Sequence, residues 1–144
     1  MLTRKRYSLK ASQPAPDLLP LGLACTLRDY QLGFLLNQLL HLDLERQPDF
    51  EVEIPRTRQR LNFCWFRYTD PELHLTYHLL SNRCGQNCLL PEYRQADYLL
   101  CVSGAESNLL RDLLFERLRS RAELQLVFEI DLRRVKHQNR LIFD

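Results

Sequence analysis

The chain has 144 residues, of which 45% are hydrophobic and 26% charged, and its net charge is +2. This composition excludes a mostly disordered chain, and the length fits a single domain over residues 1–144. The net charge is too small to indicate a polyanion partner by itself. The five cysteines are scattered, and Cys64 and Cys101 lie in apolar runs, where cysteine is a small buried hydrophobe, as suits a reducing compartment.

The beginning of the chain resembles a lipoprotein signal. Basic residues at Arg4–Arg6 are followed by an apolar run, residues 18–24, and then by Cys25. Pro20 breaks the run and Asp17 precedes it, whereas a secretory signal needs about 7–15 uninterrupted apolar residues and a membrane span about 20. We therefore expect a cytoplasmic protein with no membrane segment.

The first elements in chain order are two short strands and a helix. Residues 4–10 and 21–25 are extended in character. Thr26 and Asp29 are spaced as a capping box, which predicts a helix from Thr26 to about His41. Its broad core face consists of Leu32, Leu35, Leu36, Leu39 and Leu40.

This helix has a second apolar face, formed by Leu27, Tyr30 and Phe34. Five leucines on the opposite side suffice to dock the helix on a sheet, so burial of the two aromatic rings, each about 150–250 Å² in area, requires another surface. That surface is either the N-terminal segment before Cys25 or a second protein chain. These three residues are the candidate interface.

The middle of the chain has the pattern of strands. Residues 50–54 alternate like an edge strand, residues 56–60 form an exposed basic loop, and residues 61–68 are apolar on both faces, as in a central strand. In residues 73–80, an inward set alternates with an outward set. The inward set is Leu73, Leu75, Tyr77 and Leu79, and the outward set is His74, Thr76 and His78. A further buried strand is expected at residues 97–102.

The last part of the chain predicts a helix and a strand. Ser103 and Glu106 form a second capping box. The helix that follows has its apolar side at Leu109, Leu110, Leu113, Leu114 and Leu118. In residues 124–130 the apolar positions Leu124, Leu126, Phe128 and Ile130 alternate with polar ones, and residues 141–143 add a short edge strand. The fold class is therefore α+β, with an antiparallel sheet (a three-strand meander, 61–68, 73–80 and 97–102, plus the strand 124–130) and two helices packed on one face.

One segment carries a resemblance to a known family. Residues 90–98, Leu-Pro-Glu-Tyr-Arg-Gln-Ala-Asp-Tyr, resemble the signature of the IPExxxVDY family of small bacterial proteins, with leucine for isoleucine and alanine for valine. Residues 27–37, 74–82 and 128–131 are similar to the same family, so the resemblance covers most of the chain. It implies a fold and a bacterial cytosolic protein, but no reaction.

The signature residues have a structural interpretation and a catalytic one. They are Leu90, Pro91, Glu92, Ala96, Asp97 and Tyr98. Pro91 fixes the backbone where the chain enters a strand, and we expect Asp97 to be buried and to accept hydrogen bonds that lock the loop. Alternatively, Glu92 and Asp97 are a pair of catalytic carboxylates. The structural interpretation is preferred.

The sequence predicts no catalytic residue, metal site or cofactor. His74 and His78 share a strand face but lie about 13 Å apart, too far for one zinc ion. Cys84 and Cys88 are not followed by a second pair of ligands, and the four glycines do not cluster into a phosphate-binding loop.

Arginines provide a candidate basic patch. Its members are Arg56, Arg58, Arg60, Arg133 and Arg134. If they converge in space they suit RNA or phosphate, and strand aromatics at Trp65, Phe66, Tyr68 and Tyr77 are placed to stack bases.

Three classes of function follow. We expect a non-enzymatic protein–protein interaction or assembly module, with a homodimer as one form and the partner otherwise unidentified. An RNA-binding accessory protein that uses arginine-rich surfaces is the alternative, and an unrecognised enzyme is the third.

Overall fold

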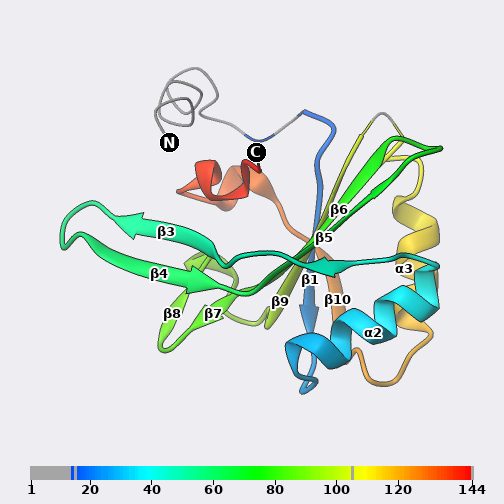
Figure 1. Ribbon diagram of the computed structural model, residues 1–144, viewed down its shortest axis with the longest axis horizontal. Helices are drawn as coiled ribbons and strands as arrows, with labels where there is room; N and C mark the ends of the chain where they lie inside the picture. The colour runs from blue at the N-terminus through cyan, green and yellow to red at the C-terminus, as the bar shows by residue number, and fades with distance from the viewer. Residues whose placement is uncertain (1–13, 15, 105, 144) are drawn as a thin grey trace.

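A computed structural model describes residue 14 and residues 16–104 and 106–143. The strand expected at residues 4–10, with Arg4–Arg6, lies outside this part. The described chain is an α+β structure with two α-helices, a six-stranded antiparallel sheet and two small hairpins (Figure 1). None of the helices in this part is long and apolar enough to cross a bilayer.

The elements have the following bounds. The strands are β1 (Leu19–Ala24), β2 (Glu45–Arg46), β3 (Phe50–Ile54), β4 (Gln59–Phe63), β5 (Trp65–Asp70), β6 (Leu75–Ser81), β7 (Arg83–Cys84), β8 (Asn87–Cys88), β9 (Tyr98–Ser103) and β10 (Leu126–Glu129). The helices are α2 (Asp29–Leu40) and α3 (Arg111–Arg119), and the short 3-10 helices are η1 (Pro91–Tyr93), η2 (Leu132–Arg134) and η3 (Gln138–Leu141).

The main sheet has the strand order β10-β1-β9-β6-β5-β2. Strands β5, β6 and β9 are adjacent in that order and antiparallel, and β10 belongs to the same sheet, so both predictions are confirmed. Strand β1 lies between β9 and β10 and pairs with both, which makes the N-terminal strand a central one. Gly22 in β1 leaves room for the Phe128 ring of β10, because a Cβ there would lie 2.4 Å from that ring.

The prediction of one continuous strand at residues 61–68 was wrong. The chain bends at Cys64, where the Cys64 carbonyl accepts a hydrogen bond from the Ser81 amide (2.9 Å). Strand β4 before the bend pairs with β3 in a separate hairpin, while β5 after it joins the main sheet. The apolar run is continuous because both parts face hydrophobic cores, but they belong to two different sheets.

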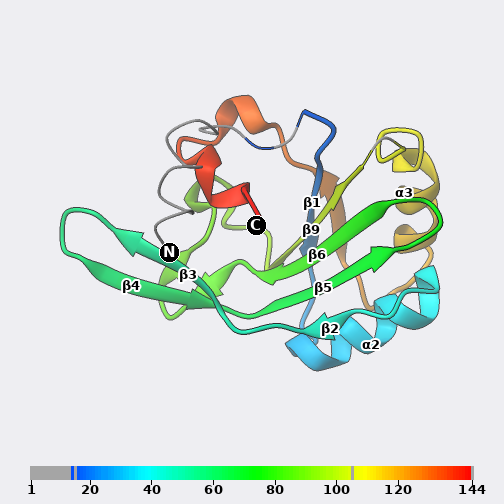
Figure 2. The same ribbon diagram turned by 45° about the horizontal axis from the view of Figure 1, so that its top comes forward.

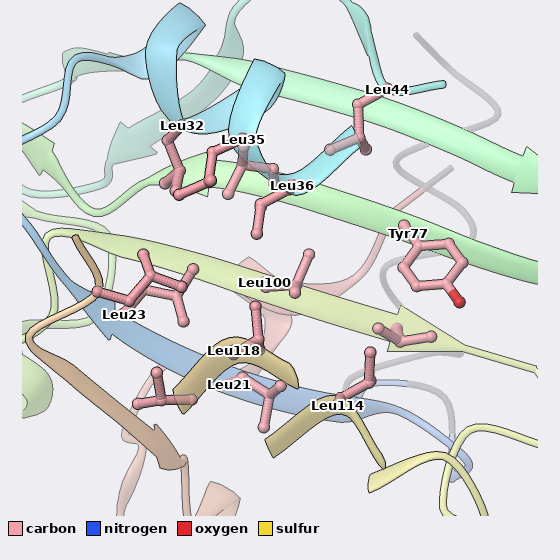
Figure 3. Packing of buried hydrophobic residues seen from close by; sticks show 14 of the residues in the cluster. Leu21, Leu23, Leu32, Leu35, Leu36, Leu44, Tyr77, Leu100, Leu114 and Leu118 are labelled. Atoms are coloured by element: carbon pink, nitrogen blue, oxygen red, sulfur yellow. The ribbon is translucent and has the colours of Figure 1, made fainter. Parts of the chain in front are cut away.

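The first core lies between one face of the sheet and the two helices, which cover the same face as predicted (Figure 3). Leucines of β1, β6 and β9 meet Leu32, Leu35 and Leu36 of α2 and Leu114 and Leu118 of α3. Burial of each such side chain contributes about 1.5–3 kcal/mol to folding, so this layer makes a large contribution to stability.

The other face of the sheet, to which the outward residue His78 of the predicted strand 73–80 points, is also covered. His78 is only 3% exposed. A second core forms there between the sheet, the β3–β4 hairpin and the C-terminal segment that carries η2 and η3 (Figure 2). Phe63, Leu80, Leu90 and Leu99 are fully buried within it.

Both helices begin later than predicted. The Arg28 amide donates to the Gln31 side chain (2.9 Å), so Gln31 caps α2, which starts at Asp29 and not at Thr26. Helix α3 starts at Arg111 instead of near Ser103. Gly104 has φ 136°, a conformation that favours glycine and cannot begin a helix, and a Cβ there would also lie 2.7 Å from the His74 carbonyl oxygen.

Three predicted core leucines are exposed instead, and they are Leu109, Leu113 and Leu126. Leu109 precedes α3, so the helical period does not orient it, and Leu113 lies about 100° around the helix from buried Leu114. Leu126 is the first residue of the edge strand β10, where it pairs with the last residue of β1. Leu73, predicted inward, is also exposed because it lies in the β5–β6 turn. Residues 141–143 form no edge strand, since Leu141 ends η3.

Candidate functional site

The outer face of α2 differs from that of an ordinary surface helix because it exposes aromatic instead of polar side chains. Tyr30 is 59% exposed and Phe34 is 65% exposed, while Leu27 is half-buried. The other side of the helix is committed to the first core, and Gly33 faces the Phe66 ring of β5. No residue from Tyr30 to Leu40 carries a charge. Tyr30 and Phe34 of the candidate interface therefore lie on one exposed, uncharged face, whereas Leu27 precedes α2 and packs against the first core.

Two signature residues hold the connection that leads into this helix. The Asp97 Oδ2 atom accepts a hydrogen bond from the Cys25 amide (3.0 Å), and the Tyr98 hydroxyl donates to the Leu27 carbonyl (2.7 Å). Burial raises the pKa of Tyr98 to about 12, so the hydroxyl keeps its proton for this bond. Asp97 makes the backbone hydrogen bond that was predicted, and its side chain is mostly buried, with 33% of it exposed.

Arg83 completes this arrangement, which we call the brace (Arg83, Asp97 and Tyr98). Its Nε atom donates to Asp97 Oδ1 (2.9 Å) and its terminal nitrogen donates to the Arg94 carbonyl (2.6 Å). The brace therefore links β7, the signature segment and the start of α2.

Asn82 organises the rest of the signature segment and was not identified from the sequence. It is fully buried, its amide nitrogen donates to the Tyr93 and Ala96 carbonyls (both 2.9 Å), and its oxygen accepts from the Leu90 amide (2.8 Å). The available signal was an asparagine directly after the apolar end of the strand 73–80, because an amide that is buried there must find hydrogen-bond partners.

Glu92 and Asp97 bind different parts of the chain. Glu92 Oε2 accepts a hydrogen bond from the Lys136 amide (3.2 Å), which ties η1 to the C-terminal segment. Its other oxygen is buried and has no hydrogen-bond partner among the residues that the structure describes. The two carboxylates thus have separate partners, and the arrangement gives them structural contacts.

A polar cleft of about 480 Å³ lies beside the brace. It is lined by Arg28, Asp29, Arg46, Asp49, Asn62, Cys64, Ser81, Arg83 and Tyr98. Arg46 pairs with Asp49 and Arg83 with Asp97, which leaves little net charge for a ligand. Burial, and then the hydrogen bond to Asp29, raises the pKa of the Cys64 thiol to about 12, so it is protonated at neutral pH and a poor nucleophile.

The histidines and cysteines are held apart. His74 occupies the β5–β6 turn with φ 56°, and His78 is buried and accepts a hydrogen bond from the Trp65 indole (3.1 Å). Cys84 and Cys88 lie in the β7–β8 hairpin as free thiols. Across residues 16–104 and 106–143, no group of three or more His, Cys, Asp or Glu side chains is placed to hold a metal ion.

The five arginines of the candidate basic patch do not form one surface. Arg56, Arg58 and Arg60 are exposed at and beside the β3–β4 turn, whereas the segment of Arg133 and Arg134 lies elsewhere in both views (Figures 1 and 2). Arg133 pairs with Asp131 (3.0 Å), and Arg134 lies over the Tyr93 ring. The patch is therefore reduced to the hairpin turn.

The strand aromatics form no stacking platform. Tyr77 is buried in the first core, and Trp65, Phe66 and Tyr68 are half-buried against neighbouring side chains.

Comparisons with known proteins assign no site. No protein-family model matches the sequence, and a search of curated proteins gives no match. Membership of the IPExxxVDY family remains a proposal that rests on the resemblance of residues 27–37, 74–82, 90–98 and 128–131.

Proposed function

We propose that this protein is a non-enzymatic interaction module that forms a homodimer through the outer face of α2. The observation that carries the proposal is the exposure of Tyr30 and Phe34, 59% and 65%, on a helix face without charges. Aromatic residues are enriched at interface centres and charged residues are depleted there. The brace supports this proposal because it fixes the start of the helix that presents the two rings.

A second copy of the chain is the partner that suits this face. Two identical uncharged faces meet across a two-fold axis without repulsion between like charges. Among the amides of this helix, Gln38 lies one turn from Phe34 and can both donate and accept, so it complements its own copy, whereas the oxygens of Gln31 and Asn37 already accept from the Arg28 and Leu44 amides. An antiparallel pair of α2 helices also places each positive helix N-terminus near the negative C-terminus of its partner.

The dimer should be weak and reversible. A standard interface buries about 800 Å² on each partner, whereas a helix of 12 residues is only about 18 Å long and presents few anchors. We expect a dissociation constant on the order of 10 μM.

The test is the solution mass of the wild type and of Phe34→Glu, measured by light scattering over a range of concentrations. The wild type should pass from monomer to dimer as concentration rises. Phe34→Glu should remain monomeric, because each interface would bury two uncompensated carboxylates.

Leu109→Glu is the matched control. Leu109 is 77% exposed, more than Phe34, and lies outside α2, so the same change should leave dimer formation intact. A wild type that stays monomeric at millimolar concentration, or a dimer that Leu109→Glu dissociates and Phe34→Glu does not, would show that the proposal is wrong.

A further inference from the structure

The β3–β4 hairpin is a protruding arm with a cationic tip. It extends away from the body of the molecule in both views (Figures 1 and 2). Arg56, Arg58 and Arg60 lie at this tip and are exposed. Within residues 16–104 and 106–143, none of the three guanidinium groups has an ion-pair partner. The tip therefore carries three arginines within five residues, of which Arg56 and Arg58 lie in the turn and Arg60 lies opposite Glu53.

A convex cationic arm fits a concave anionic partner. The major groove of B-form DNA is about 12 Å wide and admits a two-stranded β-ribbon, whose strands are about 4.8 Å apart. The major groove of A-form RNA is too deep and narrow for such an arm.

The arm does not suit single strands. Recognition of single-stranded nucleic acid relies on exposed aromatic rings that stack on bases. The aromatic residues of the hairpin, Phe50 and Phe63, are buried in the second core and are not available for stacking.

We propose that the tip of the β3–β4 hairpin binds the phosphate backbone of double-stranded DNA at a groove. The contact is confined to the tip, because Glu51 and Glu53 are exposed on β3 and repel phosphate, with Glu53 directly opposite Arg60. Two to three guanidinium groups contact phosphates, so binding is independent of sequence and the salt dependence, log K against log salt, has a slope of about −2 to −3.

The experiment is fluorescence anisotropy of a DNA duplex of about 20 base pairs titrated with protein from about 50 to 200 mM salt. The wild type should bind with a dissociation constant on the order of 10⁻⁴ M at the lowest salt, as expected for two to three phosphate contacts alone. The triple variant Arg56→Ala, Arg58→Ala, Arg60→Ala should bind at least about tenfold more weakly and lose most of the salt slope.

A control variant with the same change of charge is Arg94→Ala, Arg117→Ala, Arg133→Ala, whose three arginines are exposed on other elements. It should retain the affinity and slope of the wild type. Titrations of duplex RNA, single-stranded DNA and poly-glutamate test the choice of ligand, and each should bind more weakly than duplex DNA.

Three results would overturn the proposal. The first is no binding of the wild type to duplex DNA at low salt. The second is an equal loss of affinity in the triple variant of the arm and in the control variant, and the third is tighter binding of any of the other polyanions. The titration is repeated in Phe34→Glu, and the arm effect should persist there, so the result does not depend on the homodimer.

Discussion

His78 is a buried imidazole whose surroundings hold it neutral. The Trp65 indole donates to its Nδ1 atom (3.1 Å), and the Phe143 ring stacks on it with centroids 4.0 Å apart. Burial, and then the charge of Arg67, lowers the pKa of His78 to about 3. The acceptor role of Nδ1 places the single proton of the neutral ring on Nε2.

This imidazole makes stability depend on pH. Above a pH of about 6.5, the ordinary pKa of histidine, His78 is neutral in both the native and the unfolded chain. As pH falls below that value, the unfolded chain binds a proton that the native protein excludes, so the free energy of unfolding falls by about 1.4 kcal/mol per pH unit until pH approaches 3.

Urea unfolding at pH of about 7.5 and about 5 measures the effect, which should be about 2 kcal/mol in the wild type. His78→Phe removes the titrating group and should lose this component, whereas His137→Gln, a change at an exposed histidine, should keep it. The same pH dependence in the wild type and His78→Phe would contradict the assignment.

At the scale of elements, the brace controls how β1 passes into α2. Asp97→Ala leaves the Cys25 amide and the Arg83 guanidinium without their shared acceptor. We expect the free energy of unfolding to fall by about 1–2 kcal/mol. This is the lower part of the range for a hydrogen-bonding group that loses its partner, because Asp97 is 33% exposed and water replaces some of the contact. Thermal melting of Asp97→Ala checks this, and an unchanged melting temperature would contradict it.

A second measurement separates the brace from general stability. Arg94 contributes its carbonyl to the brace but its side chain is exposed, so Arg94→Ala should melt like the wild type. Weakening of the dimer by Asp97→Ala under conditions where it is fully folded would indicate that the brace orients the Tyr30–Phe34 face.

The main strands could be predicted from the sequence because their side-chain pattern reports burial directly. Inward and outward side chains alternate over residues 75–79, and Leu99–Val102 are apolar throughout. The two segments form the neighbouring strands β6 and β9. The bend at Cys64 could not be predicted, because an apolar run does not show which of two cores each side chain enters. The helical spacing of Tyr30 and Phe34 predicted an apolar face outside the first core, whereas the brace could not be predicted because it depends on Arg83 and Asp97 meeting in space.

At the scale of the whole molecule, the sheet has a core on each face, and the two covers differ in kind. Helices close the first core, and the β3–β4 hairpin, η1 and the C-terminal segment close the second. Phe143 packs near Phe50, Trp65 and His78, with ring centroids 5.5, 6.3 and 4.0 Å away. The end of the described chain therefore seals the site that keeps His78 neutral.

Removal of this ring should affect stability and titration together. Phe143→Ala should lower the free energy of unfolding by about 2–3 kcal/mol. This is at or below the low end of the range for replacing a core phenylalanine with alanine, because the Phe143 ring is only partly buried. Water then reaches His78, so its pKa should rise towards the ordinary value and the loss of stability between pH of about 7.5 and 5 should shrink.

Trp65, the single tryptophan, reports the opening of the second core as a red shift of its fluorescence. Phe115→Ala is the matched control, because Phe115 is a partly buried ring packed against the first core. It should also destabilise the protein, but it should leave the tryptophan emission and the pH dependence unchanged. If both variants alter the pH dependence equally, the C-terminal segment is not what keeps His78 neutral, and the assignment of the second core's cover is wrong.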